Sequence, residues 1–262
     1  MAKVFVCAST KGGVSKTTTT VNLATAAAEK GYRCLVVDFD PQGHSSLALN
    51  FVTRELEYTL ADVMMPNKKG EKAPIEKVII ETGIENLDLA PSYLTLTLAN
   101  MALAGVIARE RMLAKELRKP AIENRYDFIF IDTNPATDVL LLNALAASDY
   151  LIACSKSEFS SLDGVEMMLE QMQMLKDSEI NPHIKLLGVM VSHKRKTGHD
   201  KETMDTLKSR YPVLGCTSIR TEVNDAFKKG VPVVLFAPNS DASKEYKRVA
   251  DKLIRLFESG EL

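Results

Sequence analysis

Short apolar runs alternate with stretches of helical periodicity along most of the 262-residue chain. Seven runs have the length of buried strands: Val4–Ala8, Cys34–Asp38, Leu87–Ala90, Phe128–Asp132, Tyr150–Ala153, Leu186–Val191 and Val233–Phe236. Four intervening segments have the spacing or the end signals of helices: Thr17–Lys30, Asp138–Ala147, Leu162–Lys176 and Asp241–Phe257. Strands that are apolar throughout are typical of a parallel sheet covered on both faces. The pattern predicts an α/β fold, a doubly wound, mostly parallel twisted sheet with helices on both faces.

No linker rich in Gly, Ser or Pro separates these segments, so we expect a single domain over residues 1–262. Residues 51–85 are the least regular part and include a predicted surface loop at Asn67–Lys72. The first predicted strand begins near residue 3, so neither an N-terminal helix-turn-helix nor binding to a specific operator is expected. No apolar run approaches the roughly 18 residues of a membrane span, and the N-terminus lacks the apolar core of a signal peptide. We therefore expect a cytoplasmic protein.

Charge is unevenly distributed, although the net charge is only −1. Residues 185–262 carry 15 basic and 10 acidic side chains, whereas the whole chain has 33 and 34. On this count alone uneven solvated charge is the favoured explanation of the basic C-terminal third, and a surface that faces a polyanion is the alternative. The four cysteines have neither CxxC nor zinc spacing, so no disulfide framework and no iron–sulfur site is expected.

The most informative segment is the glycine-containing turn between the first predicted strand and the first predicted helix. It comprises Lys11, Gly12, Gly13, Val14, Ser15, Lys16, Thr17 and Thr18, a variant of the GxxxxGK[ST] loop with an extra lysine at its start. Glycines let successive N–H groups turn inward, and the helix N-terminus adds a partial positive charge. In such a phosphate-binding loop Lys16 reaches the β- and γ-phosphates and the Thr17 hydroxyl ligates Mg²⁺.

Two further predicted strands end in carboxylates. Asp38 and Asp40 close the second strand, and Asp132 closes the fourth. Open α/β sheets bind ligands at the carboxyl ends of their strands. We expect Asp38 and Asp132 in the magnesium shell, through water, and Asp40 to orient or activate the attacking water.

The segments KGGVSKTTTTVNLA, VVDFDPQG and YDFIFIDTNPA resemble the deviant Walker A, Walker A′ and Walker B motifs of the ParA/Soj/MinD ATPases. Matching segments span nearly the whole chain, and the similarity is closest to the ParA and Soj DNA-partition proteins. The resemblance implies slow ATP hydrolysis with ATP and Mg²⁺ as cofactors, and a homodimer that sandwiches ATP. It also implies that the ATP state binds non-specific double-stranded DNA on the nucleoid, and that a ParB-like or cargo adaptor protein stimulates hydrolysis and release.

Residue roles carry over from the family by position. Lys11 corresponds to the lysine that crosses the dimer to the partner's phosphates, and Asp40 to a residue implicated in hydrolysis. Together with Lys16 they form the predicted catalytic set. Near Ile219 and Thr221 the family has a Pro-Arg-Asn stretch beside the adenine, so these two are the candidate base contacts.

Two residues depart from the family pattern. Ser15 stands where a glycine is usual; it either narrows the loop or hydrogen-bonds a phosphate or the partner subunit, and either effect would slow hydrolysis. Asn134 stands where a proline usually follows the Walker B strand, and the sequence leaves its effect on the rate open.

Non-specific DNA binding requires clustered Lys and Arg side chains that contact phosphates. The candidates in the basic C-terminal third are Lys228, Lys229, Lys244, Lys247, Arg248, Lys252 and Arg255. The triplet Lys194–Lys196 is a further candidate, with a solvated loop as its alternative.

Three other functions were weighed. A MinD-like membrane ATPase needs an amphipathic tail, and the short acidic end Phe257–Leu262 gives no reason to expect membrane binding. A reductase of the nitrogenase iron-protein type is disfavoured by the cysteine positions. Positioning of a protein cargo, such as a carboxysome or a chemotaxis cluster, stays open because the partner selects the cargo.

Overall fold

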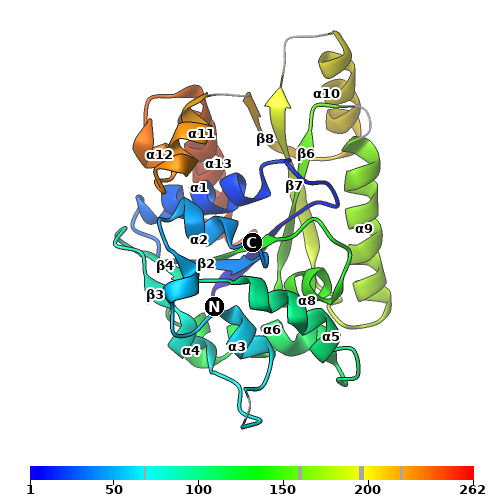
Figure 1. Ribbon diagram of the computed structural model, residues 1–262. Helices are drawn as coiled ribbons and strands as arrows, with labels where there is room; N and C mark the ends of the chain where they lie inside the picture. Colours follow the sequence, from blue (N-terminus) through cyan, green and yellow to red (C-terminus); the bar gives the residue numbers. More distant parts are fainter. Residues whose placement is uncertain (68, 159–160, 195–197, 219–220) are drawn as a thin grey trace.

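A single twisted sheet runs through the protein (Figure 1). The computed structural model describes residues 1–67, 69–158, 161–194, 198–218 and 221–262. The strands in this part of the chain are β1 (Lys3–Ala8), β2 (Cys34–Phe39), β3 (Ile80–Glu81), β4 (Leu87–Ala90), β5 (Phe128–Thr133), β6 (Tyr150–Lys156), β7 (Lys185–Lys194) and β8 (Val213–Ser218).

The strand order is β3-β4-β2-β5-β1-β6-β7-β8, and all neighbours are parallel except the antiparallel edge pair β3 and β4. This order confirms the predicted doubly wound, mostly parallel sheet. Because β2 and β5 are neighbours, Asp38 lies directly opposite Asp132 in their register. The carboxyl ends of β1, β2 and β5 therefore meet at one edge of the sheet.

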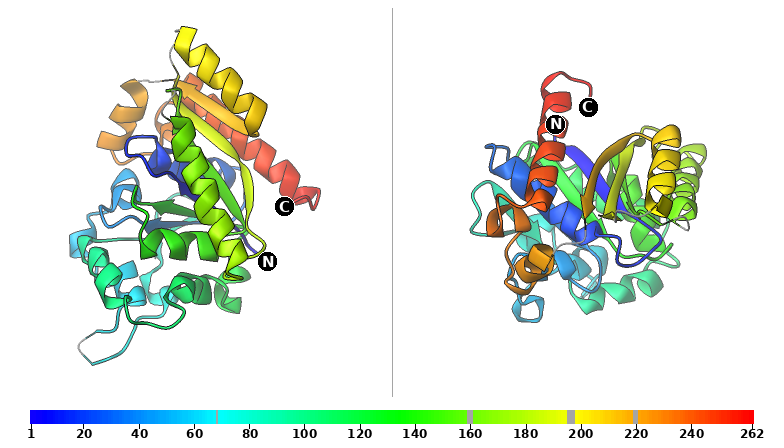
Figure 2. Two further views of the ribbon diagram at one scale, coloured as in Figure 1. Left: turned by 90° about the vertical axis from the view of Figure 1, so that its right-hand side faces the viewer. Right: turned by 90° about the horizontal axis from the view of Figure 1, so that it is seen from above.

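Helices cover both faces of the sheet (Figure 2). One face carries α1 and α13, which pack on each other, and the other carries α8, α9 and α10. The described α-helices are α1 (Lys16–Ala28), α2 (His44–Ala48), α3 (Leu60–Met64), α4 (Ile75–Val78), α5 (Ala99–Ala102), α6 (Met112–Leu117), α7 (Pro120–Glu123), α8 (Val139–Ala147), α9 (Ser161–Asp177), α10 (Gly198–Arg210), α11 (Thr221–Lys228), α12 (Val233–Phe236) and α13 (Asp241–Glu258). Short 3₁₀ turns occupy Thr53–Glu55, Leu94–Leu98 and Arg109–Arg111. None of the described helices is long and apolar enough to cross a membrane.

Alternating side chains of the central strand β1 fill two separate cores. Val4 and Val6 pack under α8 and α9, whereas Phe5 and Cys7 pack under α1 and α13. Strand β1 is thus apolar on both faces, which explains its unbroken apolar run in the sequence. Burial of apolar surface contributes about 25 cal/mol per Å², so this two-sided core is the main source of stability.

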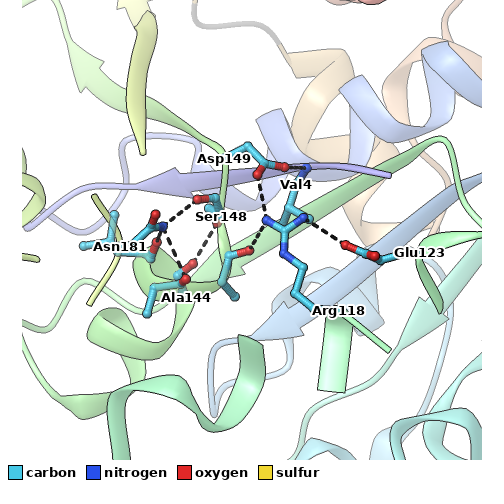
Figure 3. Close-up of polar contacts among 10 residues, drawn as sticks. Val4, Arg118, Glu123, Ala144, Ser148, Asp149 and Asn181 are labelled. Carbon is cyan, nitrogen blue, oxygen red and sulfur yellow. Dashed lines mark hydrogen bonds and ion pairs between the residues drawn. The ribbon is translucent and has the colours of Figure 1, made fainter. Parts of the chain in front are cut away.

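A polar network fixes the edge of the sheet opposite the carboxyl ends (Figure 3). Arg118 donates to Asp149 Oδ1 at 2.7 Å, and Asp149 Oδ2 accepts from the Val4 backbone N–H at 2.8 Å. Asn181 donates to the Ser148 carbonyl at 2.7 Å. These bonds hold the amino ends of β1 and β6 together, so the loops at their carboxyl ends start from a rigid base.

One strand was predicted wrongly and two strands were missed, β8 and the two-residue β3 (Ile80–Glu81). Val233–Phe236 was predicted as a strand but forms the short helix α12, because Pro232 precedes four apolar residues that fit one helical turn equally well. The strand β8 was missed, because its sequence VLGCTS mixes apolar and polar residues. The four predicted helices are confirmed as α1, α8, α9 and α13, with shifts of one or two residues at their ends. The described cysteines are free, and no group of three or more potential metal-ligating side chains occurs among the described residues.

Candidate nucleotide-binding site

The turn between β1 and α1 has the backbone of a phosphate-binding loop. Gly13 and Ser15 adopt left-handed conformations, with φ of +67° and +64°. Ser15 is the N-cap of α1, and its side chain makes no capping hydrogen bond within the described structure. The first N–H groups of α1 are therefore left for a ligand, and the positive end of the helix dipole faces that ligand.

A cavity of about 520 Å³ opens in front of this loop. It is lined by Gly12, Gly13, Val14, Ser15, Lys16, Thr17, Thr18, Asp40, Gln42, His44, Pro135, Thr217, Ser218, Val223, Asn224, Phe227 and Tyr246. The cavity lies at the carboxyl edge of the sheet, where a doubly wound fold binds its ligands. The loop supplies one part of the lining, α11 supplies Phe227 with Val223 and Asn224, and α13 supplies Tyr246.

Two fully buried carboxylates stand beside the loop. Asp132 Oδ2 accepts hydrogen bonds from Thr17 at 2.7 Å and from Ser45 at 2.8 Å. Asp38 Oδ2 accepts from the Ser46 hydroxyl at 2.6 Å and from the Ser46 N–H at 2.7 Å. The second oxygen of each, Asp38 Oδ1 and Asp132 Oδ1, is buried without a hydrogen-bond partner in the described structure.

These orphaned oxygens fit a hydrated magnesium ion. A buried polar atom without a partner costs about 1–3 kcal/mol, and water molecules of a Mg²⁺ shell would supply the missing donors. Burial, with the nearby charge of Asp132, raises the pKa of Asp38 to about 8. Burial raises the pKa of Asp132 to about 6, against the lowering effect of the Thr17 and Ser45 hydrogen bonds. A divalent cation at this position would favour the ionised form of both carboxyls.

Lys16 and Asp40 both line the cavity. The Lys16 side chain is almost buried, and its ammonium lies 3.4 Å from the Lys11 carbonyl oxygen inside the loop. Asp40 Oδ1 accepts from the Gln42 N–H at 2.9 Å, and Asp40 Oδ2 lies 4.0 Å from His44 Nδ1. Both groups line the cavity and can reach a phosphate or a water molecule in it.

The structure brings together most of the residues that the sequence singled out. Gly12 to Thr18 and Asp40 line the cavity, and Asp38 and Asp132 lie directly behind it. Lys11 is not among the described lining residues; its side chain packs beside Gly164 of α9. Of the candidate base contacts, Ile219 lies outside the described residues, and Thr221 begins α11 without lining the cavity.

Sequence reasoning missed several residues of the site. Ser45 and Ser46 of α2 hold the two buried carboxylates, and α11 lines the cavity with the apolar Val223 and Phe227 and the polar Asn224. Ser45 and Ser46 closely follow the Asp40-Pro41-Gln42-Gly43 turn, so their nearness to Asp38 could have been inferred. The sequence carries no comparable signal for α11, because its contact with the loop depends on the tertiary fold.

Ser15 provides a test of loop strain. A left-handed residue other than glycine costs about 1–2 kcal/mol, and glycine loses about 0.5–1 kcal/mol more chain entropy on folding. We therefore expect Ser15→Gly to stabilise the nucleotide-free protein by roughly 0.5–1 kcal/mol, measured by urea unfolding. Glu179→Gly is the matched control, because Glu179 has φ of +56° on the surface after α9. A loss of stability in Ser15→Gly alone would show that the Ser15 hydroxyl makes a compensating contact.

The predicted DNA-contacting residues within the described structure lie on α13 and at the end of α11. Lys244, Arg248 and Arg255 lie exposed along one face of α13, opposite its buried stripe, with half-buried Lys252 beside them. Lys228 and Lys229 are exposed at the end of α11. Lys247 instead turns toward α1 and pairs with Glu29 at 3.0 Å, and Arg248 pairs with Glu245 at 2.9 Å. Arg195 and Lys196 of the basic triplet lie outside the described residues.

Comparison with known proteins identifies the family. The family model for an AAA domain matches residues 2–186. The cell division protein PomZ of Myxococcus xanthus is 32% identical over 93% of this chain and 75% of PomZ, and the sporulation initiation inhibitor protein Soj of Bacillus subtilis is 28% identical over 97% and 98%. A crystal structure of cobyrinic acid a,c-diamide synthase from Mycobacterium smegmatis, with bound ATP analogue and magnesium, is 28% identical with a TM-score of 0.83 over 99% of this chain and 97% of that one.

Together, the loop, the buried carboxylate pair and these relatives define a P-loop ATPase. The chain belongs to the AAA-domain family whose model it matches, among the ATPases of ParA and Soj type.

Proposed function

We propose that this chain is a partition or positioning ATPase whose nucleotide state controls dimerisation and DNA binding. Its cofactors are ATP and Mg²⁺. The observation that carries the proposal is the pair of orphaned oxygens of Asp38 and Asp132 behind a phosphate-binding loop. Such a pair is costly in an empty site and becomes useful when a hydrated cation and a polyphosphate occupy the cavity.

Each loop residue has a distinct part in holding the nucleotide. The backbone N–H groups from Gly12 to Thr18 cradle the phosphates, and the Lys16 ammonium moves from the Lys11 carbonyl to the β- and γ-phosphate oxygens. The Thr17 hydroxyl would hold the cation, and the partnerless oxygens of Asp38 and Asp132 would accept hydrogen bonds from its water molecules. The cation supplies charge neutralisation for the phosphates. Asp40 orients the attacking water. It borders the cavity, and the Gln42 N–H donates to its Oδ1 and not to its Oδ2, which is the oxygen that holds the water.

A second copy completes the site. Lys11 reaches across to the partner's phosphates, so bound ATP joins the two copies and hydrolysis separates them. This arrangement makes the protein a slow switch, and a ParB-like or cargo adaptor protein accelerates its turnover. The entire chain, residues 1–262, acts as one unit in this switch.

Helix α11 offers a platform for the adenine base beside the candidate contacts Ile219 and Thr221. Phe227 is 41% exposed although it lines the cavity, and its ring makes an edge contact with His44 at 6.2 Å between centroids. An exposed aromatic ring beside a polar amide, here Asn224, is suited to stack on a purine and bond its edge.

A single-tryptophan variant tests this platform. The chain contains no tryptophan, so Phe227→Trp creates one fluorescent reporter in the cavity wall. We expect its emission to change on addition of ATP or ADP, but not on addition of inorganic tripolyphosphate, which has no base. Phe236→Trp on α12 is the control, because Phe236 is 42% exposed but does not line the cavity. Equal responses of the two variants to ATP would contradict base stacking at Phe227.

The exposed row on α13 is the proposed DNA surface. Lys244, Lys252 and Arg255 have no ion-pair partner in the described structure, so their charge is available to phosphates. Two copies joined by ATP would present this row twice. Doubling the row raises the number of phosphate contacts, which couples nucleotide state to DNA affinity and retains the protein on the nucleoid.

Charge reversal of this row tests the DNA part of the proposal. Lys244→Glu, Lys252→Glu and Arg255→Glu together are expected to lower affinity for random duplex DNA at least tenfold and to reduce the salt slope by about one per lost contact. The matched control reverses the exposed Lys69, Lys77 and Lys115, which changes net charge equally on another surface. If both triple variants lose affinity equally, net charge and not the α13 row governs binding.

A further inference from the structure

A lysine outside the recognised motifs lies against the phosphate loop. Lys156 is the last residue of β6, and a β-carbon on Gly13 would lie 3.7 Å from its ammonium nitrogen. Ala153 is the register partner of Ala8, the last residue of β1. The chain of β6 therefore continues three residues beyond the end of β1 and runs beside the loop, which places Lys156 there by sheet geometry.

The same side of the loop also contacts α9. A β-carbon on Gly164 would lie 3.5 Å from Thr10 Oγ1 and 3.9 Å from Lys11 Cδ. Strand β6 and helix α9 thus lie against one flank of the loop. Lys156 of β6 lies beside Gly13, and Gly164 of α9 lies beside Lys11. Lys11 and Lys156 both lie on this flank, and neither is among the described residues that line the nucleotide cavity.

We propose that Lys156 is a second lysine, beside Lys11, that contacts the nucleotide phosphates of the partner copy. The inference rests on the proposed ATP-dependent dimer. Within the described structure the Lys156 ammonium has no hydrogen bond or ion pair, so its charge is not already neutralised. The Lys156 ammonium stands against Gly13 of the loop, and Lys156 is not among the described residues that line its own copy's cavity.

Electrostatics gives the pair a role in sensing the nucleotide. Two copies that meet through this flank bring their Lys156 ammonium groups toward each other, and like charges oppose such a contact. Polyphosphates enclosed between the copies convert this repulsion into attraction. ATP carries one more phosphate than ADP, so a second lysine per copy strengthens the preference of the dimer for ATP.

Lys156→Met removes the charge and keeps most of the side chain's length. In sedimentation experiments with a non-hydrolysable ATP analogue and Mg²⁺, we expect the dimer dissociation constant to rise at least tenfold. Binding of a fluorescent ATP analogue, measured well below the dimerisation concentration, is expected to stay within twofold of wild type. Lys156→Arg is expected to restore dimerisation, which a purely structural role of the aliphatic stem would not require.

Lys185→Met is the matched control, because Lys185 is an exposed lysine at the first residue of β7, at the opposite edge of the sheet. It is expected to dimerise like wild type. Unchanged dimerisation of Lys156→Met overturns the inference and leaves the proposed function intact. An equal loss of monomer ATP binding and dimerisation overturns it in favour of a contact within one copy. A wild-type protein that stays monomeric with the ATP analogue contradicts both the inference and the proposed function.

Discussion

Replacing Lys16 with alanine is expected to lower the affinity for ATP by about 100-fold or more. Lys16 is 7% exposed and its ammonium lies inside the loop, 3.4 Å from the Lys11 carbonyl oxygen. Hydrogen bonds to charged groups contribute about 1.5–3 kcal/mol each, and an ammonium can make two of them to the β- and γ-phosphates. A loss of about 3 kcal/mol corresponds to more than two decades in the dissociation constant. Isothermal titration with ATP and Mg²⁺ measures it directly.

Lys30→Ala is the control for removing a lysine near the same helix. Lys30 follows α1 and pairs with Asp251 at 3.1 Å, but its side chain is 53% exposed. Exposed pairs contribute about 0–1 kcal/mol, so this variant is expected to bind ATP like wild type. If Lys16→Ala binds ATP within threefold of wild type, the assignment of the phosphate loop is wrong.

Replacing Asp40 with alanine is expected to slow ATP hydrolysis at least 100-fold while ATP affinity stays within about threefold. Asp40 borders the cavity but belongs to the turn after β2 and not to the phosphate loop. Positioning and proton transfer by one side chain contribute typically 10²–10⁴-fold in rate. The variant should therefore accumulate as the ATP-bound dimer, which single-turnover hydrolysis and sedimentation with ATP both detect.

Asp40→Asn separates chemistry from structure. The asparagine oxygen can still accept from the Gln42 N–H, which Asp40 Oδ1 does at 2.9 Å. If Asp40 acts through its charge, Asp40→Asn is expected to be as slow as Asp40→Ala. Near-normal turnover of Asp40→Asn would mean that Asp40 only holds the Gln42 turn in place.

The strands that form the phosphate site were predictable because each is an unbroken apolar run ending in a functional residue. Cys34–Asp38 and Phe128–Asp132 end at the two aspartates that lie opposite each other in the sheet. Short segments were harder: Val233–Phe236 has the apolar content of a strand, and only its packing after Pro232 makes it a helix. A run of four apolar residues carries no periodicity that separates the two.

The site shows the same division between local and tertiary information. Gly12 to Thr18 follow one another in the chain, so their shared role is visible in the sequence. Phe227 reaches the cavity because α11 packs beside α2, and Lys156 reaches the loop because β6 runs past β1. The strain at Ser15 likewise required a backbone dihedral angle, although the sequence had marked that position as unusual.

Binding to random-sequence duplex DNA tests the central claim most directly. The protein would be titrated without nucleotide, with ADP, with ATP and with ATP plus Mg²⁺, each at two salt concentrations. The account predicts tight binding only with ATP and Mg²⁺, and a steep loss of affinity at the higher salt because the contacts are to phosphates. Equal binding in all nucleotide states, or no binding in any state while ATP-dependent dimers form, would contradict a nucleotide-controlled DNA switch.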